Sequence, residues 1–186
     1  GVSALPGVER EISKIVSIVD KNHSIQSLIG EQATVAAVQQ QINECSWVHL
    51  ACHGMQDLQD PPKSCLQLYD GTLELATILQ MPLAKAEFVF LAACQTAMGD
   101  AKLVNESFHL GGGLIAAGFK GAIGTMWSMR DEDGPVVAEV VYKHMFADGR
   151  QPKATDAAKA LQLAVRKMRD RKVPYERWMP FIHMGV

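Results

Sequence analysis

The sequence predicts an α/β fold of three layers, in which helices cover both faces of a mainly parallel sheet. Two apolar runs, residues 47–54 and 88–96, have the length and composition of buried strands. Segments with apolar residues at helical spacing alternate with these runs along the chain. Such alternation is typical of right-handed crossover connections and of a sheet between two helical layers. With 186 residues, of which 48% are hydrophobic, the chain is expected to form a single domain, over 1–186, with a sizeable core.

The first part of the chain is expected to place two helices before the first buried strand. Apolar residues at helical spacing predict a helix over 8–21. Alternating polar and apolar residues predict a short strand over 24–29. Thr34 is expected to cap the second helix, in which Val38 and Ile42 lie on one face.

A β-hairpin at about 64–76 is the strongest local prediction. Asp70-Gly71 lies between two segments in which leucines alternate with polar residues, and Asp-Gly in this position favours a tight turn. The preceding residues 55–63 contain two prolines and two aspartates, so we expect a loop there. A short helix is expected to follow the hairpin over 76–80.

The second half of the chain continues the alternation of strands and helices. The run at 88–96 is apolar throughout, which favours burial on both faces in the middle of a parallel sheet. Gly111, Gly112 and Gly113 are poor helix formers, and we interpret them as allowing close approach of a helix to the sheet. The later elements are expected, in order, as a loop at 97–105, a helix at 106–117, a strand at 122–127, a helix from Val136 to Gly149, a helix before Pro174, and a strand at 178–186.

Composition narrows the class of partner. With 18 basic and 20 acidic residues the formal charge is −2, so neither nucleic acid nor an anionic membrane is expected to bind. No apolar run has the length of a transmembrane helix. The four cysteines do not form the dense framework of a small secreted scaffold, which favours reduced thiols and a cytoplasmic location.

Each buried strand reaches a residue with catalytic chemistry. The first run ends at His53-Gly54 and the second reaches Cys94. An imidazole and a thiol on the same edge of a sheet are the minimum equipment of a cysteine nucleophile with a general base. The backbone N–H groups of Gly54 and Cys94 would form an oxyanion hole. We assign His49 and Cys52, which share the strand of His53, to packing.

A metal site is the weaker interpretation of these residues. Cys52, His53 and Cys94 would be its ligands, but no C-x-x-C pair or other metal spacing is present. The triple glycine does not fit the P-loop or the dinucleotide fingerprint. We therefore predict neither a metal nor a cofactor.

Six motifs, in order along nearly the whole chain, resemble a CHAT domain, a caspase-related family often attached to TPR repeats. The motifs lie at 5–11, 30–34, 48–54 (Val-His-Leu-Ala-Cys-His-Gly), 90–99 (Phe-Leu-Ala-Ala-Cys-Gln-Thr-Ala-Met-Gly), 116–127 and 178–185. The resemblance implies a caspase-like α/β/α sandwich around a mainly parallel sheet of six strands. It also implies a cysteine endopeptidase that cleaves protein or peptide substrates through a thioester between Cys94 and the acyl group. Regulation by flanking segments, such as upstream TPR repeats, is implied by the same analogy.

This chain departs from the family pattern in two ways, which limit the family properties that can be expected of it. A strand normally precedes the Leu5-Pro6-Gly7 segment in this family. We therefore expect this chain to lack the family's first strand and to be a piece of a longer protein. Caspases carry Gln-Ala-Cys-x-Gly at the nucleophile, whereas this chain has Ala-Ala-Cys-Gln-Thr at 92–96. Aspartate preference is therefore not carried over, and a catalytically idle interaction or scaffold module is the alternative function.

The resemblance also suggests where substrate would bind. Trp127 and the acidic loop after it border the substrate groove in caspase-like folds. Trp127 would form a wall of that groove or anchor the core. Asp131 would attract a basic substrate residue or favour the dipole of the next helix. Asp57, in the loop after His53, would contact substrate or form a solvated turn.

Overall fold

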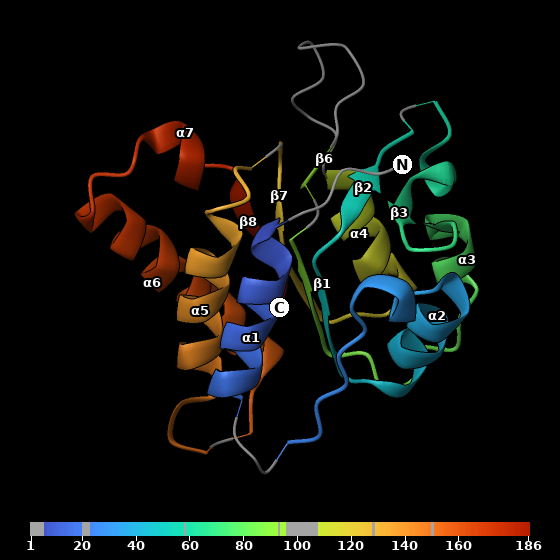
Figure 1. Ribbon diagram of the computed structural model, residues 1–186, viewed down its shortest axis with the longest axis horizontal. Helices are drawn as coiled ribbons and strands as arrows, with labels where there is room; N and C mark the ends of the chain where they lie inside the picture. Colours follow the sequence, from blue (N-terminus) through green and yellow to red (C-terminus); the bar gives the residue numbers. More distant parts are fainter. Residues whose placement is uncertain are drawn as a thin grey trace.

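The protein is a three-layer sandwich in which a sheet separates two groups of helices (Figure 1). The computed structural model describes residues 6–19, 23–57, 59–92, 94–95, 108–127, 129–149 and 151–186. One face of the sheet is covered by α1 (Pro6–Ile18), α5 (Gly134–Met145) and α6 (Ala157–Asp170). The other is covered by α2 (Val35–Glu44), α3 (Leu75–Leu79) and α4 (Phe108–Ala117). The predicted α/β class is confirmed.

The central sheet has four strands in the order β1-β5-β7-β8. They are β1 (Trp47–Leu50), β5 (Phe88–Leu91), β7 (Gly121–Thr125) and β8 (Phe181–Gly185). The first three are parallel, and β8 runs antiparallel to β7 at one edge. The sheet is therefore mainly parallel, as the apolar strand runs predicted.

A second sheet of four short strands has the order β4-β3-β2-β6. They are β2 (His53–Met55), β3 (Cys65–Gln67), β4 (Thr72–Glu74) and β6 (Cys94–Gln95). Two residues separate β1 from β2, and two separate β5 from β6, so the second sheet continues the β1–β5 pair beyond its carboxyl end. Antiparallel pairing of β3 with β4 confirms the predicted hairpin.

Strand β5 divides the core in two. Successive strand residues point to opposite faces of the sheet, so Phe88 and Phe90 enter the cluster under α1, α5 and α6. Val89 and Leu91 enter the cluster on the opposite face. Burial of β5 on both faces explains why its sequence is apolar throughout.

Local signals explain several helix boundaries. The Thr34 hydroxyl accepts a hydrogen bond from Ala37 N–H, which confirms the predicted cap of α2. A side chain at Gly111 would collide with Met184 of β8, and one at Gly113 would collide with Leu75 of α3. The glycines therefore permit the close packing that was predicted, against a helix as well as against the sheet.

Three boundary predictions are corrected. Residues 24–29 are irregular and mostly exposed, because no neighbouring strand pairs with this alternating segment. Helix α1 ends at Ile18 rather than at residue 21. The short helix α7 (Tyr175–Trp178) follows Pro174, so β8 begins only at Phe181.

The remaining described segments are four short 3-10 turns and irregular connections. The 3-10 turns are Gly30–Gln32, Pro61–Lys63, Ala147–Gly149 and Ala154–Asp156. The predicted loop at 97–105 lies outside the described residues. Among the residues that the structure describes, no helix has the length and apolar character needed to cross a membrane.

Candidate active site

The backbone of His53 lies directly beside that of Cys94. Strands β2 and β6 run parallel, with His53 paired to Cys94 and Gly54 paired to Gln95. Both strands extend from the carboxyl ends of β1 and β5, which are themselves neighbours (Figure 1). In open parallel sheets, ligands bind at the carboxyl ends of the strands. One strand pairing thus brings two residues that are distant in sequence to this edge.

Strand β2 is held on both sides. His53 is paired with Gln67 and Gly54 with Leu66 in the antiparallel ladder with β3, opposite the ladder with β6. His53 is only 6% exposed, and Gly54 is buried. The side chain of Cys94 lies outside what the structure describes, so the contact between thiol and imidazole stays a prediction, as does the oxyanion-hole role of Gly54.

Cys52 lies in the break between β1 and β2 rather than within a strand. Its half-buried side chain packs against the core cluster on the α2–α4 face. Packing is therefore the observed role of Cys52. Within the described part of the chain, no group of three or more His, Cys, Asp or Glu side chains is arranged to hold a metal ion.

A buried polar network holds β1 just before the candidate site. The Nδ1 atom of His49 lies 3.2 Å from the Tyr142 hydroxyl of α5, within hydrogen-bond distance. Its Nε2 atom lies 3.2 Å from Glu11 Oε1 of α1, close enough for an ion pair, although the two atoms are not aligned as a hydrogen bond. The ring also stacks on Phe90, with centroids 4.9 Å apart. His49 therefore packs as predicted and also joins three elements through polar contacts.

The surroundings of this network are strongly desolvated. Glu11 is 3% and Tyr142 5% exposed. Burial raises the pKa of the Tyr142 hydroxyl well above its usual range, and the nearby Glu11 carboxylate raises it further. Tyr142 therefore stays protonated and available as a hydrogen-bond donor. No local sequence signal predicts this network, because its members are brought together only by the packing of α1 and α5 on β1.

The predicted substrate residues have the following positions. Trp127 is half-buried two residues after β7. The Asp131 carboxylate accepts a 2.8 Å hydrogen bond from Gly7 N–H in the first turn of α1. The Asp57 carboxylate accepts hydrogen bonds from the N–H groups of Gln59 and Asp60. These contacts are with the chain's own backbone, and the substrate roles of Trp127, Asp131 and Asp57 stay predictions.

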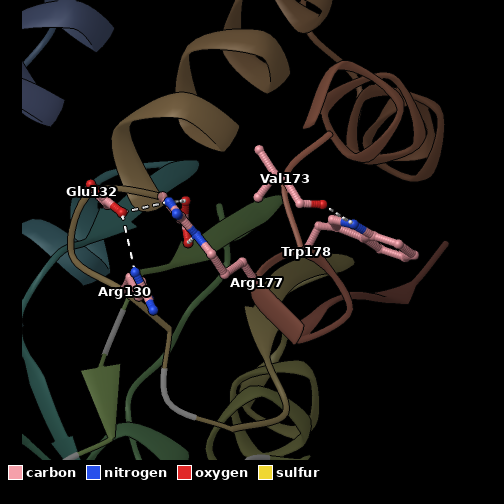
Figure 2. A network of polar contacts seen from close by, with 6 residues as sticks. Arg130, Glu132, Val173, Arg177 and Trp178 are labelled. Atoms are coloured by element: carbon pink, nitrogen blue, oxygen red, sulfur yellow. Dashed lines mark hydrogen bonds and ion pairs between the residues drawn. The ribbon is translucent and has the colours of Figure 1, made fainter. Parts of the chain in front are cut away.

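Sequence reasoning missed a buried ion pair at the end of the same acidic loop. Asp133 is 2% exposed, and its carboxylate accepts hydrogen bonds from Arg177 Nε and Nη2 at 3.0 and 2.6 Å. Glu132 also contacts Arg177 Nη2, at 2.6 Å, and Figure 2 shows this network joining the loop to α7. These carboxylates hold the pKa of Arg177 above its usual value, and the largest cause is the hydrogen bonding that Arg177 donates to Asp133. The acidic loop is thus fastened to α7.

The fold and the strand pairing define a three-layer α/β domain with a mainly parallel sheet. A family model described as the CHAT domain matches residues 1–186, and the chain belongs to this family, which has a caspase-like fold. A comparison with curated proteins found no significant match.

Proposed function

We propose that this CHAT domain is a cysteine endopeptidase in which Cys94 is the nucleophile and His53 the general acid and base. The pairing of their backbones across β2 and β6 is the observation that carries the proposal. Neighbouring strands lie about 4.8 Å apart, a separation that cysteine and histidine side chains can bridge. Membership of a caspase-like family supports the same assignment.

The proposed reaction has two stages. His53 accepts the thiol proton, and the Cys94 thiolate attacks the scissile carbonyl carbon. The N–H groups of Gly54 and Cys94 stabilise the resulting oxyanion. When the C–N bond breaks, His53 protonates the leaving amine, which leaves a thioester on Cys94. His53 then deprotonates a water molecule that attacks the thioester, and the new carboxylic acid and the Cys94 thiol are released.

The proposed substrates are proteins or peptides that bind along the loop after β7. Trp127 would form one wall of the groove, with Asp131 and Asp57 near its ends. Flanking segments of a longer protein, such as TPR repeats, are proposed to control access to the site. We further propose that the protein acts in the cytoplasm without a cofactor.

A thiol-directed peptide probe tests the dyad. Peptides bearing an acyloxymethyl ketone alkylate a thiolate that binds them as a substrate would, and mass spectrometry identifies the labelled cysteine. We expect labelling of Cys94, strong loss of labelling in His53→Ala, and unchanged labelling of Cys94 in the control Cys52→Ala. Burial raises the pKa of the Cys45 and Cys65 thiols, which keeps their background labelling low at neutral pH.

Two results would contradict the peptidase. One is equal labelling of Cys94 in the wild type and in His53→Ala, because the imidazole would then not activate the thiol. The other is an absence of Cys94 labelling in full-length protein with every peptide of a diverse probe set. That result would favour the catalytically idle interaction module.

A further inference from the structure

A small basic cavity lies at the end of the acidic loop, where Glu132 and Asp133 line it. Its volume is about 230 Å³, and four basic residues line it: Arg10 and Lys14 of α1, Arg171 after α6, and Arg177 of α7. The other lining residues are Glu132, Asp133, Pro135, Val136, Met168 and Val173. Cations from three separate parts of the chain thus meet around one cavity.

Internal ion pairs account for only some of these charges. Arg177 is held by Asp133 and Glu132, and Figure 2 shows its contact with Glu132. Lys14 forms an ion pair with Glu139 at 2.7 Å, but Glu139 also forms an ion pair with Lys143 at 2.6 Å. The side chains of Arg10 and Arg171 make no hydrogen bond or ion pair with another residue among those described. The four cations that line the cavity therefore exceed its two carboxylates.

The start of α5 borders this cavity, but its first N–H groups already have partners, because Val136 and Val137 N–H donate to the Asp133 carbonyl oxygen. The first residues of α5, including Pro135 and Val136, line the cavity. The N-terminus of a helix carries partial positive charge and attracts anions. The Asp133 carboxylate precedes this helix but makes no capping hydrogen bond to it, because it is bound by Arg177. Arg10 and Arg171 are thus the groups left to attract an anion.

We propose that this cavity binds a small phosphorylated molecule through its phosphate oxygens. Guanidinium groups present paired N–H donors that match the spacing of phosphate oxygens. Arg10 and Arg171 would supply those donors, while Val136, Val173 and Met168 would contact the organic part of the ligand. The limited volume favours a phosphate monoester or a diphosphate over a long polyanion.

Glu132 is the internal competitor for the ligand. Its side chain is 62% exposed, yet its carboxylate contacts Arg177 Nη2 in the cavity wall. An incoming phosphate would displace Glu132 from this position, whereas the buried Asp133 would keep its bidentate contact. Removal of the Glu132 charge is therefore expected to tighten phosphate binding. Removal of a carboxylate far from the cavity would have only a weak effect, because salt screens distant surface charges.

Titration calorimetry with pyrophosphate, and with inorganic phosphate for comparison, tests the proposal on the full chain. We expect saturable binding at one site, weakened about tenfold by Arg10→Gln or Arg171→Gln, because a hydrogen bond to a charged group is lost. Glu132→Gln should bind several-fold more tightly. Arg166→Gln is the matched control, since this exposed arginine of α6 does not line the cavity.

Pyrophosphate binding does not depend on the peptidase proposal, because Cys94→Ala should bind pyrophosphate as the wild type does. Thermal unfolding of each variant checks that it is folded. No saturable binding of either anion to the wild type would overturn the proposal. An equal loss of affinity in Arg166→Gln and Arg171→Gln would do so as well, because binding would then reflect overall charge.

Discussion

At the scale of single residues, the buried contacts of His49 link β1 to the two helices α1 and α5. Its ring lies between Glu11 of α1 and Tyr142 of α5, and both partners are almost fully buried. Polar groups removed from water cost free energy unless they find partners. The contacts of His49 with Tyr142 and Glu11 therefore form only when both helices pack against β1, a few residues before His53.

Tyr142→Phe tests this network. The substitution keeps the ring and removes the hydroxyl that contacts His49 Nδ1, so the free energy of unfolding should fall by about 1 kcal/mol. Urea denaturation measures this change. Tyr175→Phe is the control, because Tyr175 is 66% exposed and should have an unchanged midpoint. A Tyr142→Phe protein as stable as the wild type would show that the hydroxyl contact contributes nothing to stability.

Asp133 and Glu132 form a matched pair for a second test. Both carboxylates contact Arg177, but the Asp133 side chain is 3% exposed and the Glu132 side chain 62%. Asp133 accepts two charge-assisted hydrogen bonds in a buried position, so Asp133→Asn should cost about 2 kcal/mol, whereas Glu132→Gln should cost less than about 1 kcal/mol. Chemical denaturation compares the two variants. Equal losses would contradict the view that burial sets the strength of this attachment.

At the scale of elements, α1 is fastened to α5 by one carboxylate between two lysines. Hydrogen bonds from Lys14 and Lys143 lower the pKa of Glu139 to about 2. Because the unfolded-state pKa of glutamate is about 4.3, this contact stabilises the fold above that pH. The contribution is lost as the pH falls through the folded-state value.

The pH dependence of Glu139→Gln follows from that shift. At pH 7 the variant should be less stable than the wild type by about 1 kcal/mol, since the carboxylate is partly exposed to solvent. The difference should shrink between pH 4.3 and pH 2, where the wild type itself takes up the proton. Denaturation curves at several pH values measure it. A difference that stays constant down to pH 2 would show that the lysines do not hold the carboxylate ionised.

Elements with a local signal could be predicted, whereas those that depend on distant partners could not. The turn signal Asp70-Gly71 predicted the β3–β4 hairpin, and the capping residue Thr34 predicted the start of α2. The alternating segment 24–29 failed as a strand because alternation forms a strand only where a partner is available. The break at Ala51-Cys52 between β1 and β2 could not be predicted, because neither residue is a turn former such as Gly, Pro, Asn or Asp.

At the scale of the whole molecule, the central feature is the continuation of β1 and β5 into β2 and β6. The apolar runs predicted that the two segments would be buried strands, and their parallel pairing follows from the crossover topology. The predicted contact between the His53 and Cys94 side chains would depend on side-chain positions that sequence patterns do not specify. The same holds for the basic cavity, whose four cations come from three separate segments.

The peptidase proposal is tested most directly by a peptide-library cleavage profile of the full-length protein beside its Cys94→Ala form. We predict cleavage at a defined set of bonds by the wild type and none by Cys94→Ala. Identical cleavage by the two proteins would assign the activity to something other than Cys94. No cleavage by either protein, under conditions that include its natural partners, would contradict an endopeptidase built on His53 and Cys94.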